Sequence, residues 1–397
     1  MTEMTESERS SLAVSGAEAP PPAERTALSD RLPRAWMFPL LAFAVAWVLI
    51  LAAWNIAGAI YGSRSWWRYF YYDDSAYYGA LARYWYGSAS PGVLHHDPRR
   101  AAFFPLYPAL IRLGMFLTGN VIVAGLIVQI LAGAASAVAV WALASDVYGH
   151  RVADRTVLLY CAFPGAFVLG AMYSEALGVL LAATCLLAVL HRKWLLAGLL
   201  AMLGSAEHST LIVLTPVLGL AAVQAIWSRR EWRSLLAPAL APLGMLGFFA
   251  YVAPMFHDYL FWSHLERRGW NVHIDFGAHE LSVLTWSVPG VHKYPWQFGL
   301  LVAMFWIALI GIVLLIAARV PWPITLYTAL VFIFCAVSFP SGILPRYTLT
   351  MFGIFLGYAA KLPSWVFWPA LVVSAGVMAL LAGYYPTHLH GLPHWPP

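Results

Sequence analysis

Long apolar stretches recur from residue 36 to residue 384, and they constrain the fold of this chain more than any other feature. A helix needs about 20 residues to cross about 30 Å of hydrocarbon, and about eleven segments approach that length. They lie at 36–60, 120–145, 154–172, 175–190, 194–206, 209–227, 235–256, 298–318, 322–340, 347–360 and 364–384. Only 10% of the residues are charged, whereas a soluble chain carries about a quarter. The sequence therefore predicts an all-α polytopic membrane protein of about 11 transmembrane helices. The segments at 175–190, 194–206 and 347–360 are short, which predicts tilted, broken or re-entrant helices.

Three regions follow from this pattern. Residues 1–34 are polar and rich in Ser, Glu, Pro and Ala, a composition that cannot bury a core and predicts a disordered tail. The acidic start of this tail and the late first apolar run do not fit a signal peptide. Residues 35–384 form the predicted transmembrane domain, and residues 385–397 form a second tail.

Short connections rich in arginine predict the orientation. The sequences "GHRVADR", "HRK" and "SRREWR" lie between apolar segments, and basic short loops favour the cytoplasmic side. The N-terminus is then cytoplasmic, whereas loops 61–119 and 257–297 and the tail 385–397 lie on the outer face. Abundant Ala, Gly, Pro and Arg, with few lysines, indicates a bacterial chain and hence the cytoplasmic membrane.

The stretch "RYFYYDDSAYYGALARYW" places two adjacent carboxylates, Asp73 and Asp74, just after the first apolar segment. A carboxylate facing lipid is costly, so both should face water or protein. Tyr78, Leu81 and Trp85 follow Asp74 at helical spacing, which predicts a helix at the membrane interface. One aspartate can cap this helix while the other points into a cleft. A second helix should open at Pro105 and close at Gly119.

Four motifs carry a family resemblance. They are "DSAYYGALA", "AFFPLYP", "YSE" and "PRY", in this order, with Asp74, Tyr78, Leu81, Ala82, Phe103, Phe104, Pro105, Tyr107, Pro108, Tyr173, Ser174, Glu175 and Arg346 at the matching positions. The set resembles the PIG-V-like mannosyltransferase branch of the GT-C glycosyltransferases over residues 36 to about 360. The chain departs from that pattern at Asp73, where relatives carry Trp, and at 205–210, where "SAEHST" stands in place of an arginine-bearing segment.

The resemblance implies transfer of a sugar from a polyprenyl-phosphate donor to an acceptor hydroxyl on the outer face, with inversion. Such a reaction needs a carboxylate to accept the hydroxyl proton and a cation to hold the phosphate. Asp74 is the predicted base and Asp73 the second candidate. Arg346 fits the phosphate, although it also fits an arginine that snorkels to the interface. Mannose is implied by the resemblance alone, and the donor needs no cofactor, nucleotide or metal.

Five further residues complete the predicted substrate site: Tyr78, Tyr173, Glu175, Arg100 and His208. Glu175 can instead favour the start of a helix that Ser174 caps. Arg100 can meet any lipid phosphate, and His208 can be a hydrogen-bonded core residue. Aromatic residues crowd 257–297, where they suit sugar faces or an ordinary interface belt equally well.

Metal binding and nucleic-acid binding are both disfavoured. "HHD" at 95–97 and the histidines at 388, 390 and 394 have mixed spacing, and the basic residues form no stripe. Two other functions remain open, a lipid or small-solute transporter and a non-catalytic component of a membrane assembly. The acceptor is a glycolipid, a lipoglycan or a protein.

Overall fold

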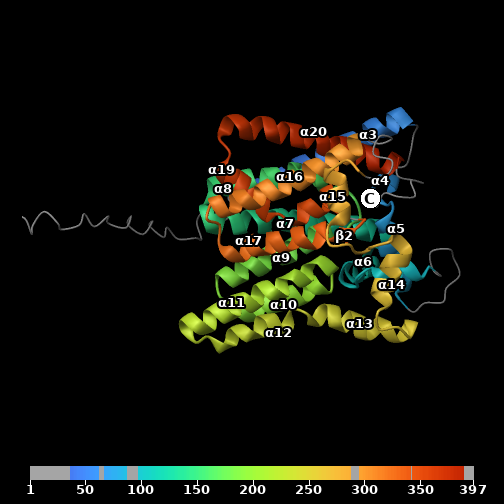
Figure 1. Cartoon of the computed structure of the whole chain (residues 1–397). Helices are drawn as coiled ribbons and strands as arrows, with labels where there is room; N and C mark the ends of the chain where they lie inside the picture. The colour runs from blue at the N-terminus through green and yellow to red at the C-terminus, as the bar shows by residue number, and fades with distance from the viewer. Residues whose placement is uncertain (1–35, 62–66, 87–96, 288–294, 341, 389–397) are drawn as a thin grey trace, which may run out of the picture. The chain divides into compact units, whose positions relative to one another are not determined.

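The computed structural model of the chain describes residues 36–61, 67–86, 97–287, 295–340 and 342–388 (Figure 1). The predicted tail 1–34, most of the tail 385–397 and the histidines at 95, 96, 390 and 394 lie outside the described residues. Helices make up nearly all of the described structure. Their bounds are α3 (Met37–Tyr61), α4 (Trp67–Phe70), α5 (Asp74–Tyr84), η1 (Pro98–Ala102), α6 (Leu106–Thr118), α7 (Val121–Tyr148), α8 (His150–Ala162), η2 (Pro164–Gly170), α9 (Glu175–Leu190), α10 (Trp194–Ser205), η3 (Ser209–Val213), α11 (Leu214–Arg229), η4 (Trp232–Leu235), α12 (Leu236–Leu240), α13 (Leu243–Phe256), α14 (Phe261–Trp270), α15 (Ala278–Leu284), α16 (Pro295–Ala317), α17 (Trp322–Ala336), α18 (Pro345–Thr350), α19 (Gly353–Lys361) and α20 (Ser364–His388).

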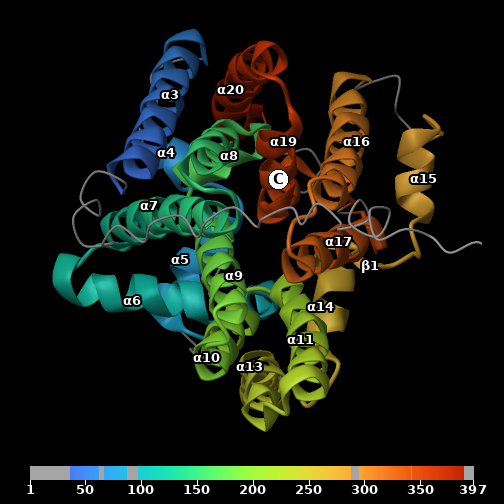
Figure 2. The same cartoon turned by 90° about the vertical axis from the view of Figure 1, so that its left-hand side faces the viewer.

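The apolar segments found in the sequence are mainly helical, although 322–340 ends in the short strand Ser338–Phe339, and this confirms the all-α membrane prediction. Within the described residues, six helical stretches are long and apolar enough to cross a membrane, or seven if a bent pair counts as one span. The helices α9, α10 and α17 are apolar but shorter, and the segment 347–360 is divided between α18 and α19. The last helix, α20, continues to His388, past the predicted end at residue 384. In the view of Figure 2, α7 packs between α8 and α9, and α19 contacts both α8 and α16.

The segment predicted at 154–172 is broken. The helices α8 and η2 meet at 73°, because Pro164 lacks the amide N–H that would continue α8. A break within an apolar region leaves carbonyl groups without helical partners. Gln129 of α7 donates hydrogen bonds to two of these carbonyl groups. Its buried Nε2 donates to the carbonyl oxygens of Val168 (3.1 Å) and Leu169 (3.3 Å). One polar side chain therefore stabilises irregular backbone inside the bundle.

The basic connections that the sequence places inside the cell gather at one end of the helices. The turn after α9 contacts the end of α7 through His191 and Asp146 (3.0 Å) and contacts the turn after α11 through the ion pair of Arg192 with Glu231. The helices α4, α5, α14 and α15 lie at the opposite end (Figure 1). The bundle thus separates a basic end from an end built by the two long loops.

A short antiparallel sheet joins the second of these loops to the segment that follows α17. Strand β1 (His273–Ile274) pairs with β2 (Ser338–Phe339), with His273 opposite Phe339 and Ile274 opposite Ser338. This pairing ties the loop that follows α13 to the chain that leads into α18.

Candidate active site

A cavity opens at the end of the bundle where α5, α14 and α18 meet. It encloses about 320 Å³, at the lower limit of typical small-molecule sites. Its lining combines polar groups from distant parts of the chain with an apolar wall from α17. The lining residues are Asp74, Tyr78, Ala102, Phe103, Phe104, Glu175, His208, Ser209, Thr210, Trp262, Ser263, Glu266, Trp270, Val272, His273, Ile274, Phe334, Cys335, Val337, Ser338, Arg346 and Tyr347.

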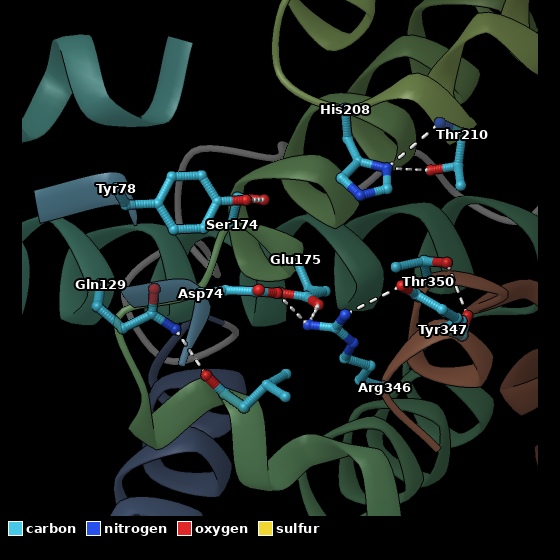
Figure 3. A network of polar contacts seen from close by, with 11 residues as sticks. Asp74, Tyr78, Gln129, Ser174, Glu175, His208, Thr210, Arg346, Tyr347 and Thr350 are labelled. Carbon is cyan, nitrogen blue, oxygen red and sulfur yellow. Dashed lines mark hydrogen bonds and ion pairs between the residues drawn. The ribbon is translucent and has the colours of Figure 1, made fainter. Parts of the chain in front are cut away.

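Asp74 and Arg346 form an ion pair at the base of this cavity. Nη1 of Arg346 donates to Oδ2 of Asp74 at 2.6 Å, and both side chains are largely buried (Figure 3). Asp74 is the first residue of α5, and Asp73 occupies the N-cap position. The side chain of Asp73 makes no capping hydrogen bond. The expectation that one aspartate caps this helix with its side chain is thus not met at Asp73, whereas the Asp74 carboxylate faces Arg346 in the cavity.

The Arg346 guanidinium is only 7% exposed and has several neighbours. Its Nη2 donates to the hydroxyl of Tyr347 at 3.0 Å, and Oε1 of Glu175 lies 3.7 Å from Nη1. The rings of Tyr173 and Tyr347 have their centroids 5.5 and 4.8 Å from its Cζ. A buried cation with two carboxylates and two aromatic faces is held in one orientation, which does not fit an arginine that snorkels to water.

The backbone before Arg346 is fixed by a close approach of two segments. Pro345 is the first residue of α18, and its carbonyl oxygen lies so near Gly165 of η2 that a Cβ at Gly165 would overlap it. The backbone of Gly165 in η2 therefore packs directly against the backbone of Pro345, the residue before Arg346. This contact fixes the backbone position from which the Arg346 side chain extends.

Tyr78, Ser174 and Glu175 hold the first loop against α9. The hydroxyls of Tyr78 and Ser174 are 2.8 Å apart and buried. Ser174 precedes α9 but makes no capping hydrogen bond with its side chain, so the expectation that it caps this helix is wrong. Glu175 lies in the first turn of α9, where a negative charge is favoured, and it also faces Arg346. Contact of Glu175 with a substrate stays a prediction.

His208 caps η3 and lines the cavity. Its Nδ1 accepts from the backbone N–H of Thr210 at 3.2 Å and lies 2.9 Å from Oγ1 of the same residue (Figure 3). The ring is thus hydrogen-bonded locally, and its edge contributes to the cavity wall.

Three predicted residues do not line the cavity. Tyr173 is buried behind it, with its ring 5.5 Å from that of Tyr72 and 5.5 Å from the Arg346 guanidinium carbon. Nη2 of Arg100 donates to the carbonyl oxygen of Tyr86 at 3.2 Å, so this arginine supports the loop structure. Asp73 lies beside the cavity, and burial together with the negative charge of Asp74 raises its pKa to about 6. Asp74, Tyr78, Glu175, His208 and Arg346 are brought together.

Comparisons with known proteins found one matching family model and several similar structures. Residues 98–273 match the family model of dolichyl-phosphate-mannose-protein mannosyltransferases. The chain is similar to two crystal structures of ArnT from Cupriavidus metallidurans. The structure bound to undecaprenyl phosphate gives a TM-score of 0.52 at 16% identity over 85% of this chain. The apo structure gives a TM-score of 0.51 at 17% identity over 84% of this chain. The chain therefore shares the fold of these ArnT structures over most of its length. It spans 62% and 61% of those ArnT chains.

Two other comparisons were made. The apo oligosaccharyltransferase of Archaeoglobus fulgidus gives a TM-score of 0.47 at 12% identity, over 88% of this chain and 56% of that one. No curated protein sequence matches the chain. The family model covers Glu175 and His208 but neither Asp74 nor Arg346, so the ion pair joins a residue before the matched region to one after it.

Sequence reasoning missed the side of this cavity that α14 forms. Trp262, Glu266 and Trp270 all line it. Their spacing of four residues places them on one helical face, a signal that the sequence already carried. In the part of the chain that the structure describes, no group of three or more His, Cys, Asp and Glu is placed to hold a metal ion.

Proposed function

We propose that the chain is an integral-membrane glycosyltransferase that moves a sugar, mannose, from a polyprenyl-phosphate donor to an acceptor hydroxyl outside the cytoplasmic membrane, with inversion. The observation that carries the proposal is the contact of Asp74 with Arg346 in one cavity. A carboxylate is the base that such a transfer needs, and a guanidinium is the cation that a phosphate leaving group needs. The PIG-V-like motifs and the mannosyltransferase family model support mannose.

The donor class is supported by the relatives. The matched family is named for dolichyl-phosphate-mannose, and one of the similar ArnT structures is bound to undecaprenyl phosphate. In this chain the apolar wall of Phe334, Cys335 and Val337 from the end of α17 borders the same cavity as Arg346. A lipid phosphate entering along this wall would meet the guanidinium with its charged group.

The outer face is supported by the distribution of charge. The cavity lies at the end built by the long loops, whereas the short basic connections, with Arg192 among them, lie at the other end. Basic short loops favour the cytoplasmic side, which supports an outer location for the cavity.

The reaction needs few steps from the protein. The phosphate of the donor binds Arg346 in place of the Asp74 carboxylate, which then accepts the proton of the acceptor hydroxyl. The acceptor oxygen bonds to C1 of the sugar as the bond from C1 to the phosphate oxygen breaks, and polyprenyl phosphate leaves with the electron pair. Attack opposite the leaving group inverts the configuration at C1. No nucleotide enters, because the donor is already activated.

The test is a transfer assay with purified protein in liposomes. The probes are polyprenyl-phosphate mannose labelled in the sugar, as donor, and a lipid extract from a strain that lacks the gene, as acceptor. We expect labelled glycolipid with the wild-type chain and none with Asp74→Asn. Undiminished transfer by the variant would reject the assigned base. Label that reaches the opposite side of the membrane without transfer would support a transporter instead.

A further inference from the structure

The helix α14 presents an aromatic and acidic face to the cavity. Trp262, Glu266 and Trp270, which we call the α14 stripe, line it together. Other aromatic side chains of the same loop point elsewhere, since Tyr259 is 90% exposed and Phe276 is 88% exposed. Some aromatic residues of the loop are thus exposed, as suits a membrane interface, whereas Trp262 and Trp270 face the candidate site.

Both indoles of the stripe are held by their neighbours. The Nε1–H of Trp262 donates to the carbonyl oxygen of Ala102 at 3.0 Å, and its ring packs 6.2 Å from that of Phe104. Trp270 packs edge-on against Tyr77 and Phe103, with ring centroids 5.7 Å away in each case. Because Trp262 has already used its one polar atom, it offers the cavity an apolar surface. Rings fixed in this way lose little freedom when a ligand packs on them.

Glu266 lies between the two indoles and is available to a ligand. Among the described residues no hydrogen bond or ion pair involves its carboxyl group, in contrast to Asp74 in the same cavity. Burial, and then the charge of Asp74, raise the pKa of Glu266 to about 8. At neutral pH the group is mainly a protonated acid, which can both donate and accept a hydrogen bond.

We propose that the α14 stripe is a carbohydrate-binding wall, where a pyranose ring packs its C–H face on an indole and Glu266 hydrogen-bonds its hydroxyls. An aromatic face beside a hydrogen-bonding carboxyl suits a ring that is apolar on one side and polar at its edge. A prenyl chain would leave Glu266 without a partner, which is unfavourable in a partly buried site. This inference rests on the proposed function, and the ring belongs either to the donor sugar or to a sugar of the acceptor.

The experiment compares Glu266→Ala, Glu266→Gln and Trp270→Ala with a matched control, Tyr259→Ala, an exposed aromatic of the same loop. Apparent KM is measured for polyprenyl-phosphate mannose and, separately, for the lipid extract as acceptor. We expect Glu266→Ala and Trp270→Ala to raise the apparent KM of one substrate about tenfold, the effect of losing one good contact. Glu266→Gln, which still donates and accepts, should raise it less, and the control should leave it unchanged.

The substrate whose KM rises identifies the source of the ring. Binding of undecaprenyl phosphate, which carries no sugar, should stay within twofold in every variant, and a larger loss would indicate a general disturbance of the cavity. The proposal is overturned if folded Glu266→Ala and Trp270→Ala proteins keep both KM values within twofold of wild type. Should Trp270→Ala fail to fold, Trp270→Phe replaces it.

Failure of the proposed function would be seen separately, as absence of transfer by the wild-type chain. The stripe is then tested by titration with octyl mannoside, a pyranoside without phosphate. Weaker binding by Glu266→Ala than by the control supports the wall, and equal binding overturns it.

Discussion

Removing the negative charge of Asp74 should abolish transfer at a moderate cost in stability. Asp74→Asn keeps the size and shape of the side chain but removes the group that accepts the proton, a contribution of about 10²–10⁴-fold in rate. Because Arg346 remains, donor binding should change less than kcat. We therefore expect a fall of at least about 100-fold in kcat with a much smaller change in the apparent KM of the donor.

The stability cost follows from what surrounds Arg346. Leaving a buried charge without any partner costs about 3–5 kcal/mol. Here Oε1 of Glu175 remains 3.7 Å from Nη1, and the Tyr173 ring remains 5.5 Å from the guanidinium carbon. The guanidinium is therefore not left alone, and an asparagine oxygen can still accept one hydrogen bond. We expect a loss of about 1–3 kcal/mol, the range of one hydrogen bond to a charged group.

A double-mutant cycle with Arg346→Gln isolates the pair. Both single variants and the double variant are purified in the same detergent, and unfolding is followed by heat or denaturant. The double variant should be less destabilised than the sum of the single variants by at least about 1 kcal/mol, because the second substitution removes a charge already without its partner. Additive effects would mean that the ion pair does not form, and Asp74→Asn with more than a tenth of wild-type activity would mean that the base lies elsewhere.

Three further predictions test the site. Gly165→Ala should displace the Pro345 carbonyl and lower both the unfolding temperature and the rate of transfer. Gly247→Ala is the control, since nothing lies within 4 Å of the added Cβ, and it should change neither quantity. Equal effects of the two substitutions in a melt and an activity assay would contradict this. Arg346→Lys should recover only part of the donor affinity that Arg346→Ala loses, since an ammonium group cannot form the guanidinium fork; equal donor titrations for both would count against a phosphate role. Transfer should fall as pH rises through about 8, because Glu266 then loses its proton. Burial and Asp74 raise the pKa of Glu266 to about 8, and the charge of Arg346 opposes this rise. Glu266→Gln should remove this fall from the pH–rate profile.

Local rules were enough to predict the helices that begin or end at a strong signal. The helix α6 runs between Pro105 and Gly119, as expected, because proline suits the first turn and Gly119 has a left-handed φ of 64° at the C-cap. The start of α5 at Asp74 and the apolar spans follow from spacing and hydropathy in the same way. These features depend on residues within a turn or two of each other.

Features that depend on distant contacts were beyond such rules. The sequence named Asp74 and Arg346 separately, but their contact joins residues 272 positions apart and depends on the packing of η2 under α18. The sequence predicts one continuous span over 154–172, whereas the structure breaks it at Pro164. The carbonyl groups beyond the break are paired by Gln129 of another helix, and this pairing cannot be predicted from neighbouring residues. The sequence leaves the role of α14 open, because residues spaced four apart share one helical face whether that face lines a cavity or meets lipid.

The contact between Asp74 and Arg346 also bears on how the proposed reaction would begin. In the ion pair, Oδ2 of Asp74 accepts a hydrogen bond from Nη1 of Arg346, so this carboxylate oxygen is already engaged. A lipid phosphate that binds Arg346 competes for the same Nη1 and would leave Oδ2 of Asp74 free to accept a proton beside the bound donor. Donor binding would thereby prepare the base for the acceptor hydroxyl. Glu175, at 3.7 Å, can keep part of its attraction to the guanidinium throughout, so Arg346 need not leave its buried position for the exchange to occur.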